Sequence, residues 1–309
     1  MKKLILILIC ALLLLTSCGK QTDDGKLNIV ATMFPQYDFA REIAKDSANV
    51  ELLLDFGADS HSYEPTPADI IRISKADLFI YTGDDMELWA KKLLESADVK
   101  ESIDSGSLHV LDLSKHVELV CFGHEHEGEH DHDEEYDTHI WTSPKNALKM
   151  CKAITDSICS IDESGTTTYQ NNFESYSAKL SSLSEKMTEA AESAMLDTAY
   201  FGGSFAFAYM FRDMGLSHVS IYEGCASHAE PSAAALTKMV EAIKAGGAKY
   251  VLYDAASEQK IAEAIADECD IEVLHLHAIH NITKAEFDAG ENYISLMEKN
   301  IETLRKALS

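Results

Sequence analysis

Apolar and polar positions alternate along the chain with two different periods. Short apolar runs, which predict buried strands, stand at 27–32, 50–54, 78–81, 109–111, 198–201, 218–222, 250–253 and 272–276. Amphipathic stretches, which predict helices, stand between them at 36–45, 67–75, 86–97, 204–214, 231–244 and 258–268. A last helix is expected from Thr283, where Glu286 completes a capping box. Strands that alternate with helices predict an α/β fold with mostly parallel sheets.

One stretch near the middle of the chain departs from this alternation. Between Thr166 and Leu196, apolar residues recur at intervals of four and three: Tyr169, Phe173, Tyr176, Leu180, Leu183, Met187, Ala190 and Ala194. This spacing predicts one continuous apolar stripe on a helix of roughly 30 residues, about 45 Å long. A coiled-coil dimer seam is the alternative, although several stripe positions are Ala or Tyr. We therefore expect two doubly wound α/β lobes, 27–165 and 198–309, joined by one long rigid helix over 166–197.

The first residues predict an export signal. Lys2 and Lys3 precede an unbroken apolar run from Leu4 to Leu15, which is shorter than the roughly 20 residues that span a bilayer. The small residues before Cys18 resemble the bacterial lipobox, which implies cleavage before this cysteine and a lipid on its sulfur. An ordinary secretory signal with an incidental cysteine is the alternative. We expect a signal peptide over 1–17, a polar tether over 18–26, and an extracytoplasmic protein anchored to the cell membrane through Cys18.

The net charge narrows the expected partners, and the cysteine content indicates whether disulfides are expected. The net charge of −26 would repel nucleic acid and anionic lipid, so neither is expected as a partner. The chain has 7 cysteines, two of which lie in the signal or at the anchor. The odd number that remains contains no Cys-x-x-Cys pair, so free thiols are expected instead of a disulfide framework.

A segment rich in histidine and acid, 121–137, interrupts the first lobe. Its acids are Glu125, Glu127, Glu129, Asp131, Asp133, Glu134, Glu135 and Asp137, and no core could bury them together. Its imidazoles are ligands for borderline-soft divalent metals. We expect a solvated loop that captures metal weakly, because ordering a mobile chain costs entropy, through His124, His126, His130 and His132. An acidic loop with incidental histidines is the alternative.

A tight metal site needs ligands on rigid elements. His61 follows the second predicted strand in a polar turn, so it is expected at the carboxyl end of the sheet. His139 stands where the acidic segment returns to ordered structure. Ligands of open α/β sheets bind at the carboxyl ends of the strands, here the cleft between the lobes. Taken singly, either histidine could equally be a surface or core residue.

Several short motifs together resemble a known family. They are Thr32-Met33-Phe34-Pro35-Gln36-Tyr37, His61-Ser62-Tyr63-Glu64-Pro65-Thr66-Pro67, Asp137-Thr138-His139-Ile140-Trp141, Glu230-Pro231-Ser232-Ala233 and Tyr293-Ile294-Ser295-Leu296-Met297. Jointly they resemble the zinc/manganese-specific solute-binding lipoproteins of ABC importers, from about Leu27 to Leu308. The His-rich acidic loop resembles the zinc branch in particular. The resemblance implies two α/β lobes joined by a rigid helix, one metal between them, and an ABC permease with its ATPase as partners.

The resemblance also implies a set of metal ligands, which this sequence matches incompletely. His61 and His139 match the two histidine ligands of the first lobe, and Asp254 matches the carboxylate at the end of a strand in the second. The position of a third histidine ligand is occupied by Ser204, which is a poor zinc ligand. We expect His280 to take this role, since it follows the last predicted strand; His228 or a loop histidine are the alternatives.

Ligand chemistry favours zinc over manganese. Three imidazoles with the carboxylate of Asp254 would form a closed, nitrogen-rich tetrahedral site, whereas two imidazoles with two carboxylates would suit manganese better. We therefore expect a monomeric zinc receptor without enzymatic activity. The alternatives are a manganese-specific receptor or adhesin-type lipoprotein and, more remotely, a zinc-dependent hydrolase. A hydrolase would need an open coordination position and a general base, and the His-Glu-x-x-His motif is absent from the sequence.

Overall fold

Two four-stranded parallel sheets organise the chain. The computed structural model describes residues 25–58, 60–121, 136–224, 231–254 and 258–309. Cys18, His228 and the four loop histidines, His124, His126, His130 and His132, lie outside these residues. Among the helices of the described part, none is long and apolar enough to cross a membrane.

The first lobe is built on the sheet order β2-β1-β3-β4, with every neighbouring pair parallel. Its strands are β1 (Leu27–Ala31), β2 (Ala48–Leu52), β3 (Leu78–Tyr81) and β4 (His109–Asp112). One face of the sheet packs against α2 (Phe34–Ala44) and α6 (Pro144–Ile161), and the other against α3 (Pro67–Ser74), α4 (Leu88–Leu94) and α5 (Ala97–Asp104). Short 3₁₀ helices are η1 (Lys45–Ser47), η2 (Leu113–His116), η3 (Ile140–Thr142) and η4 (Glu163–Gly165).

The second lobe repeats this strand order as β6-β5-β7-β8, again parallel throughout. Its strands are β5 (Thr198–Phe205), β6 (Ser217–Glu223), β7 (Tyr250–Tyr253) and β8 (Glu272–His275). One face packs against α9 (Ala233–Gly246) and α10 (Gln259–Cys269), and the other against α8 (Ala208–Met214) and α12 (Tyr293–Ala307), while α11 (Lys284–Asp288) precedes α12. In both lobes the chain order reverses beside the first strand, which is where doubly wound sheets place their ligands.

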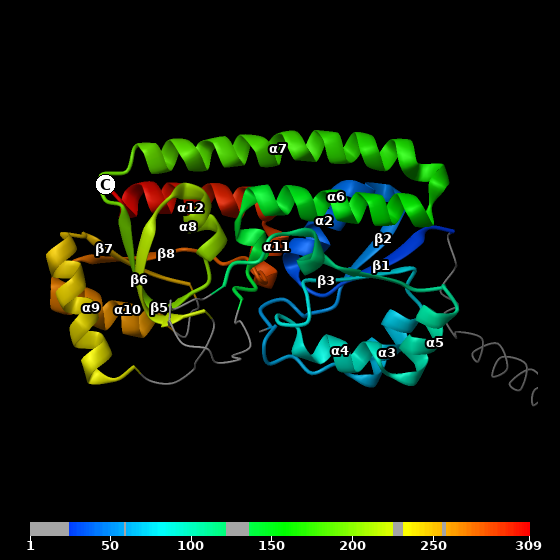
Figure 1. Cartoon of the computed structure of the whole chain (residues 1–309), viewed down its shortest axis with the longest axis horizontal. Coiled ribbons are helices and arrows are strands. Elements are labelled where there is room, and N and C mark those ends of the chain that lie inside the picture. Colours follow the sequence, from blue (N-terminus) through cyan, green and yellow to red (C-terminus); the bar gives the residue numbers. More distant parts are fainter. Residues whose placement is uncertain (1–24, 59, 122–135, 225–230, 255–257) are drawn as a thin grey trace, which may run out of the picture.

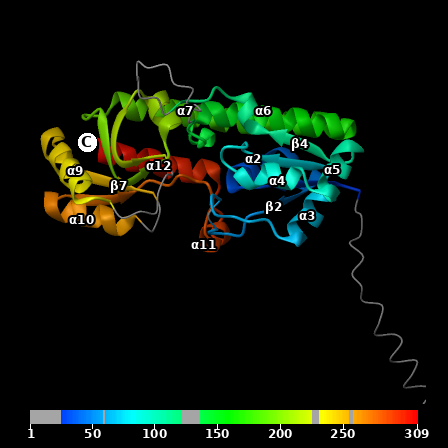
Figure 2. The same ribbon diagram turned by 60° about the horizontal axis from the view of Figure 1, so that its bottom comes forward.

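The long helix α7 (Thr166–Glu192) runs across both lobes (Figure 1). It packs against α2 and α6 of the first lobe and α12 of the second. Its buried residues, Tyr169, Tyr176, Leu180, Leu183, Met187 and Ala190, are all members of the predicted stripe. They belong to one hydrophobic core that continues through both lobes, so the stripe is covered within the molecule. Figure 2 shows α6 in the first lobe and α12 in the second, and each of them packs against α7.

Several of the predicted elements were wrong in extent. The helix expected over 86–97 is two helices, because Ser96 donates from Oγ to the carbonyl of Leu93 and takes an extended conformation before α5. The strand expected to end at Phe201 continues to Phe205, with a register shift after Phe201, so Ser204 lies on a strand and not on a helix. The last helix is divided into α11 and α12, although the predicted capping box at Thr283 is present.

Candidate metal site

Three histidines from three loops meet between the two lobes. His61, His139 and His280 each present one ring nitrogen, and these nitrogens all lie within 4.8 Å of one another. Their ring centroids are 5.4 to 6.3 Å apart. Zinc bound by nitrogens at 2.0–2.1 Å in a tetrahedron needs them roughly 3.4 Å apart, so small side-chain rotations would close the site. His280, which the sequence suggested as the third histidine ligand in place of Ser204, therefore lies next to the two histidines of the first lobe.

His139 is the buried member of the group, with 2% of its surface exposed. Its Nδ1 lies 2.7 Å from Oδ1 of Asp137, which also accepts the backbone N–H of His139. The other carboxylate oxygen of Asp137 accepts the backbone N–H of Ala208, and its carbonyl accepts the hydroxyl of Tyr209, both in the second lobe. Because Asp137 holds Nδ1, Nε2 is the ring nitrogen that can bind a metal, as is common for histidine ligands.

In the sequence, Asp137 was named among the acids of the loop and in the motif that contains His139, but no role at the metal site was predicted for it. Its role as the orienting partner of His139 was missed. The signal was its place two residues before a candidate ligand, at the point where the acidic segment ends.

His61 is the exposed member, on the loop between β2 and α3. The loop is tied directly to the second lobe. Asn281 donates from its side-chain amide to the carbonyls of Asp55 and Ala58, at 2.8 and 2.9 Å, and Gly57 donates its N–H to the carbonyl of Ile282. Because Asn281 directly follows His280, these bonds place the His61 loop against the His280 loop.

His280 follows β8 and stands after a strained turn. Ile279 has a φ of 62°, a left-handed conformation that β-branched residues rarely adopt. Its N–H donates to Nδ1 of His277 at 2.8 Å, and the side-chain amide of Asn300 donates to the carbonyl of His277. The carbonyl of His280 accepts the N–H of Phe34 from the first lobe. These bonds fix the turn that directs the His280 imidazole toward the first lobe.

Asp254 lies beside this group without being part of it. One carboxylate oxygen, Oδ1, accepts the N–H of Ala278 at 2.7 Å, and the other, Oδ2, lies 4.0 Å from Nε2 of His280. The carbonyl of Asp254 accepts Nε2–H of His275 at 2.8 Å. The carboxylate is therefore held next to the imidazole of His280 but too far from it for a hydrogen bond.

Other contacts hold Ser204 and the two further histidines near the end of β8, His275 and His277. Ser204 is not in the three-histidine group, and its backbone N–H donates to Oε1 of Glu258 at 2.8 Å. The rings of His275 and His277 lie next to each other, with centroids 5.5 Å apart. Burial lowers the pKa of His277, which suits a neutral ring that accepts a hydrogen bond inside the lobe.

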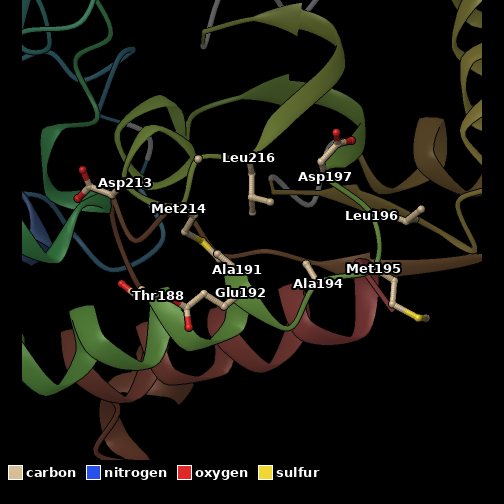
Figure 3. A pocket seen from close by; sticks show the side chains of 11 residues that line it. Thr188, Ala191, Glu192, Ala194, Met195, Leu196, Asp197, Asp213, Met214 and Leu216 are labelled. Atoms are coloured by element: carbon tan, nitrogen blue, oxygen red, sulfur yellow. The ribbon is translucent and has the colours of Figure 1, made fainter.

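A separate hollow of about 500 Å³ lies where α7 passes into β5, beside the turn between α8 and β6 (Figure 3). The described residues that line it include Glu192, Asp197 and Asp213 but no histidine. In Figure 3 these three carboxylates point away from one another. They do not converge on a point, so this hollow lacks the geometry of a metal site.

Comparison with known proteins identifies the proteins to which the chain is similar. The model of the family described as "Zinc-uptake complex component A periplasmic" matches residues 29–307. The zinc-binding lipoprotein AdcA of Streptococcus pneumoniae strain R6 is 36% identical over 99% of this chain, which spans only 61% of that protein's length. The high-affinity zinc uptake system protein ZnuA of Bacillus subtilis is 31% identical over 96% of this chain and 94% of its own length.

Solved structures agree in fold. The Zn(II)-bound ZnuA-like domain of S. pneumoniae AdcA has a TM-score of 0.78 at 33% identity, covering 92% of this chain and 99% of that domain. The metal-dependent lipoprotein YcdH of B. subtilis also has a TM-score of 0.78, at 31% identity, with coverage of 92% and 99%. The laminin-binding protein Lbp of Streptococcus pyogenes shares the fold alone, with a TM-score of 0.75 at 23% identity over 92% of this chain and all of that one.

Proposed function

Because the chain belongs to the family of the zinc-uptake complex component A, we propose that it is an extracytoplasmic zinc receptor of an ABC importer. In this role it captures Zn²⁺ as cargo and delivers it to a membrane permease that is driven by an ATPase. The observation that carries the proposal is the convergence of His61, His139 and His280 from both lobes. Three imidazoles form a nitrogen-rich donor set that suits zinc better than manganese.

Asp254 is the proposed fourth ligand. Its Oδ2 lies 4.0 Å from Nε2 of His280, a separation that a small rotation of either side chain would reduce to the spacing of two ligands on one ion. The N–H of Ala278 already holds the other oxygen, so the carboxylate would bind through a single oxygen. A carboxylate with three neutral imidazoles would leave a bound Zn²⁺ with a net charge of +1 and no open position for water chemistry.

The parts of the chain before the first strand and within the acidic loop complete the proposal. A lipid on Cys18 would keep the receptor at the outer face of the membrane, near its permease. The histidines of the loop, His124, His126, His130 and His132, would raise the local zinc concentration and pass the ion to the tight site. Capture needs only proximity, so these residues need no fixed geometry.

Competitive titration with zinc and manganese tests the proposal. We expect one tight zinc site per chain, with zinc preferred over manganese, which His61→Ala destroys and deletion of Glu125 to Glu135 leaves in place. His109→Ala is the control, because His109 is an exposed residue of β4 outside the three-histidine group. Tight binding that survives His61→Ala but disappears with the loop would replace the interlobe receptor with a surface metal buffer.

A further inference from the structure

The indole of Trp141 joins the two loops that carry His139 and His280. Trp141 is completely buried, and its Nε1–H donates to the carbonyl of Ala278 at 2.7 Å. Its ring lies 5.4 Å from that of His139 and 6.1 Å from that of His280, centroid to centroid. One side chain of the first lobe is thus bonded to the turn before His280 and packed against both imidazoles.

Tyr293 holds the backbone of Trp141 through a hydrogen bond. It is the first residue of α12, is completely buried, and donates from its hydroxyl to the carbonyl of Trp141 at 2.6 Å. The backbone N–H of Tyr293 donates in turn to Oδ2 of Asp38 on α2 of the first lobe, at 3.0 Å. Three hydrogen bonds in succession therefore cross between the lobes, and each lies in the buried interior, where water cannot replace a lost partner.

We propose that Trp141 and Tyr293 are positioning residues that set the separation of His139 and His280 before zinc arrives. The proposal rests on the function proposed above. His139 and His280 belong to different lobes. Without such a link, zinc would have to order both loops, and the loss of conformational entropy would weaken every binding event. The bond from Trp141 to Ala278 removes that cost from binding, because the two loops are already joined in the metal-free protein.

The chain supplies matched controls for both side chains. Trp89 Nε1 and Tyr176 Oη are buried and have no hydrogen-bond partner among the described residues. Trp89→Phe and Tyr176→Phe therefore remove the same atoms as Trp141→Phe and Tyr293→Phe without breaking such a bond. Any general cost of trimming an aromatic side chain appears in all four variants.

The first experiment measures the zinc dissociation constant and dissociation rate of the four variants and the wild-type protein by chelator competition. We expect Trp141→Phe and Tyr293→Phe to weaken zinc binding by about tenfold or more through faster dissociation, as losses around a metal site commonly do. The two controls should stay within about twofold, whatever the changes in the melting temperature of the metal-free proteins. Should Trp141→Phe fail to fold, Tyr293→Phe, which removes one oxygen, still decides the question.

A spectroscopic measurement separates positioning from mere support of the fold. The chain has 2 tryptophans, so Trp89→Phe leaves Trp141 as the only one. Zinc should change the fluorescence of this variant and not that of Trp141→Phe. Equal zinc affinities in the four variants, or a zinc-insensitive Trp141, would overturn the inference and leave the receptor function intact. Tight binding that survives His61→Ala would instead overturn the proposed function.

Discussion

Oδ1 of Asp137 lies 2.7 Å from Nδ1 of His139, and both side chains are buried. The carboxylate also accepts the N–H of Ala208 from the second lobe. The second lobe therefore helps to hold the side chain that orients a histidine of the first lobe. This arrangement fixes which nitrogen of His139 can face an ion and strengthens that nitrogen as a ligand. It also makes the geometry of one ligand depend on the contact between the lobes.

Asp137→Asn is therefore expected to weaken zinc binding without removing a ligand. An amide of the same shape can still bond to Nδ1, but it lacks the charge that stabilises the metal-bound imidazole. Loss of such a partner typically costs about 10–100-fold in metal affinity. Chelator competition measures this loss. Asp156→Asn is the control, since Asp156 pairs with Lys152 on the exposed side of α6 and should bind zinc as the wild type does.

Substitution of a direct ligand should have a larger effect. His280→Ala is expected to weaken zinc binding by more than the roughly 10–100-fold that loss of an orienting partner costs, because one donor of the site disappears. Asp254→Ala should also reduce affinity, and zinc isothermal titration with both variants measures the two losses. If His280→Ala binds zinc as tightly as the wild type, another residue supplies the third imidazole.

Ser204→Ala is expected to leave zinc affinity within about threefold of the wild type, far below the loss that an orienting partner causes. The hydrogen bond that ties Ser204 to Glu258 uses its backbone N–H, which the substitution keeps. The measurement is the same zinc titration, alongside His280→Ala. A large loss would show that the strand position itself belongs to the site.

The stability of the first lobe should depend on pH through Glu87. Its carboxylate is fully buried and accepts hydrogen bonds from Thr32 Oγ1 and from the backbone N–H groups of Thr82 and Gly83. Burial raises the pKa of this carboxyl from 4.5 to about 7. The folded protein thus binds more protons than the unfolded chain between these values, so the contribution of Glu87 is greatest below pH 4.5 and is lost as pH rises to about 7.

Glu87→Gln should remove this dependence. The difference in free energy of unfolding between variant and wild type is expected to shift in favour of the variant by about 3 kcal/mol from pH 4.5 to 8. Denaturant titration of the metal-free proteins at several pH values measures it. A difference that stays constant with pH would mean that Glu87 ionises normally in the folded state.

The local pattern of apolar and polar residues was enough to predict much of the fold of this protein. The period of the apolar residues predicted both α/β lobes and the helix between them, because burial of one face imposes that period on each element separately. It failed where side-chain bonds act against it, as at Ser96, where one helix became two. The strand-end positions of His61 and His280 also followed from local pattern, because parallel strands present their carboxyl ends at one edge.

Only the tertiary structure decided which of these residues meet. Trp141 and Ala278 are 137 positions apart, and the bond between them exists because α7 and the shared core hold the lobes in one arrangement. The same packing brings His280 to His61 and His139, and leaves Asp254 one contact away. Hydrophobic periodicity acts over a few residues, whereas the convergence of ligands depends on contacts between segments that are distant in the chain, and no local pattern encodes those.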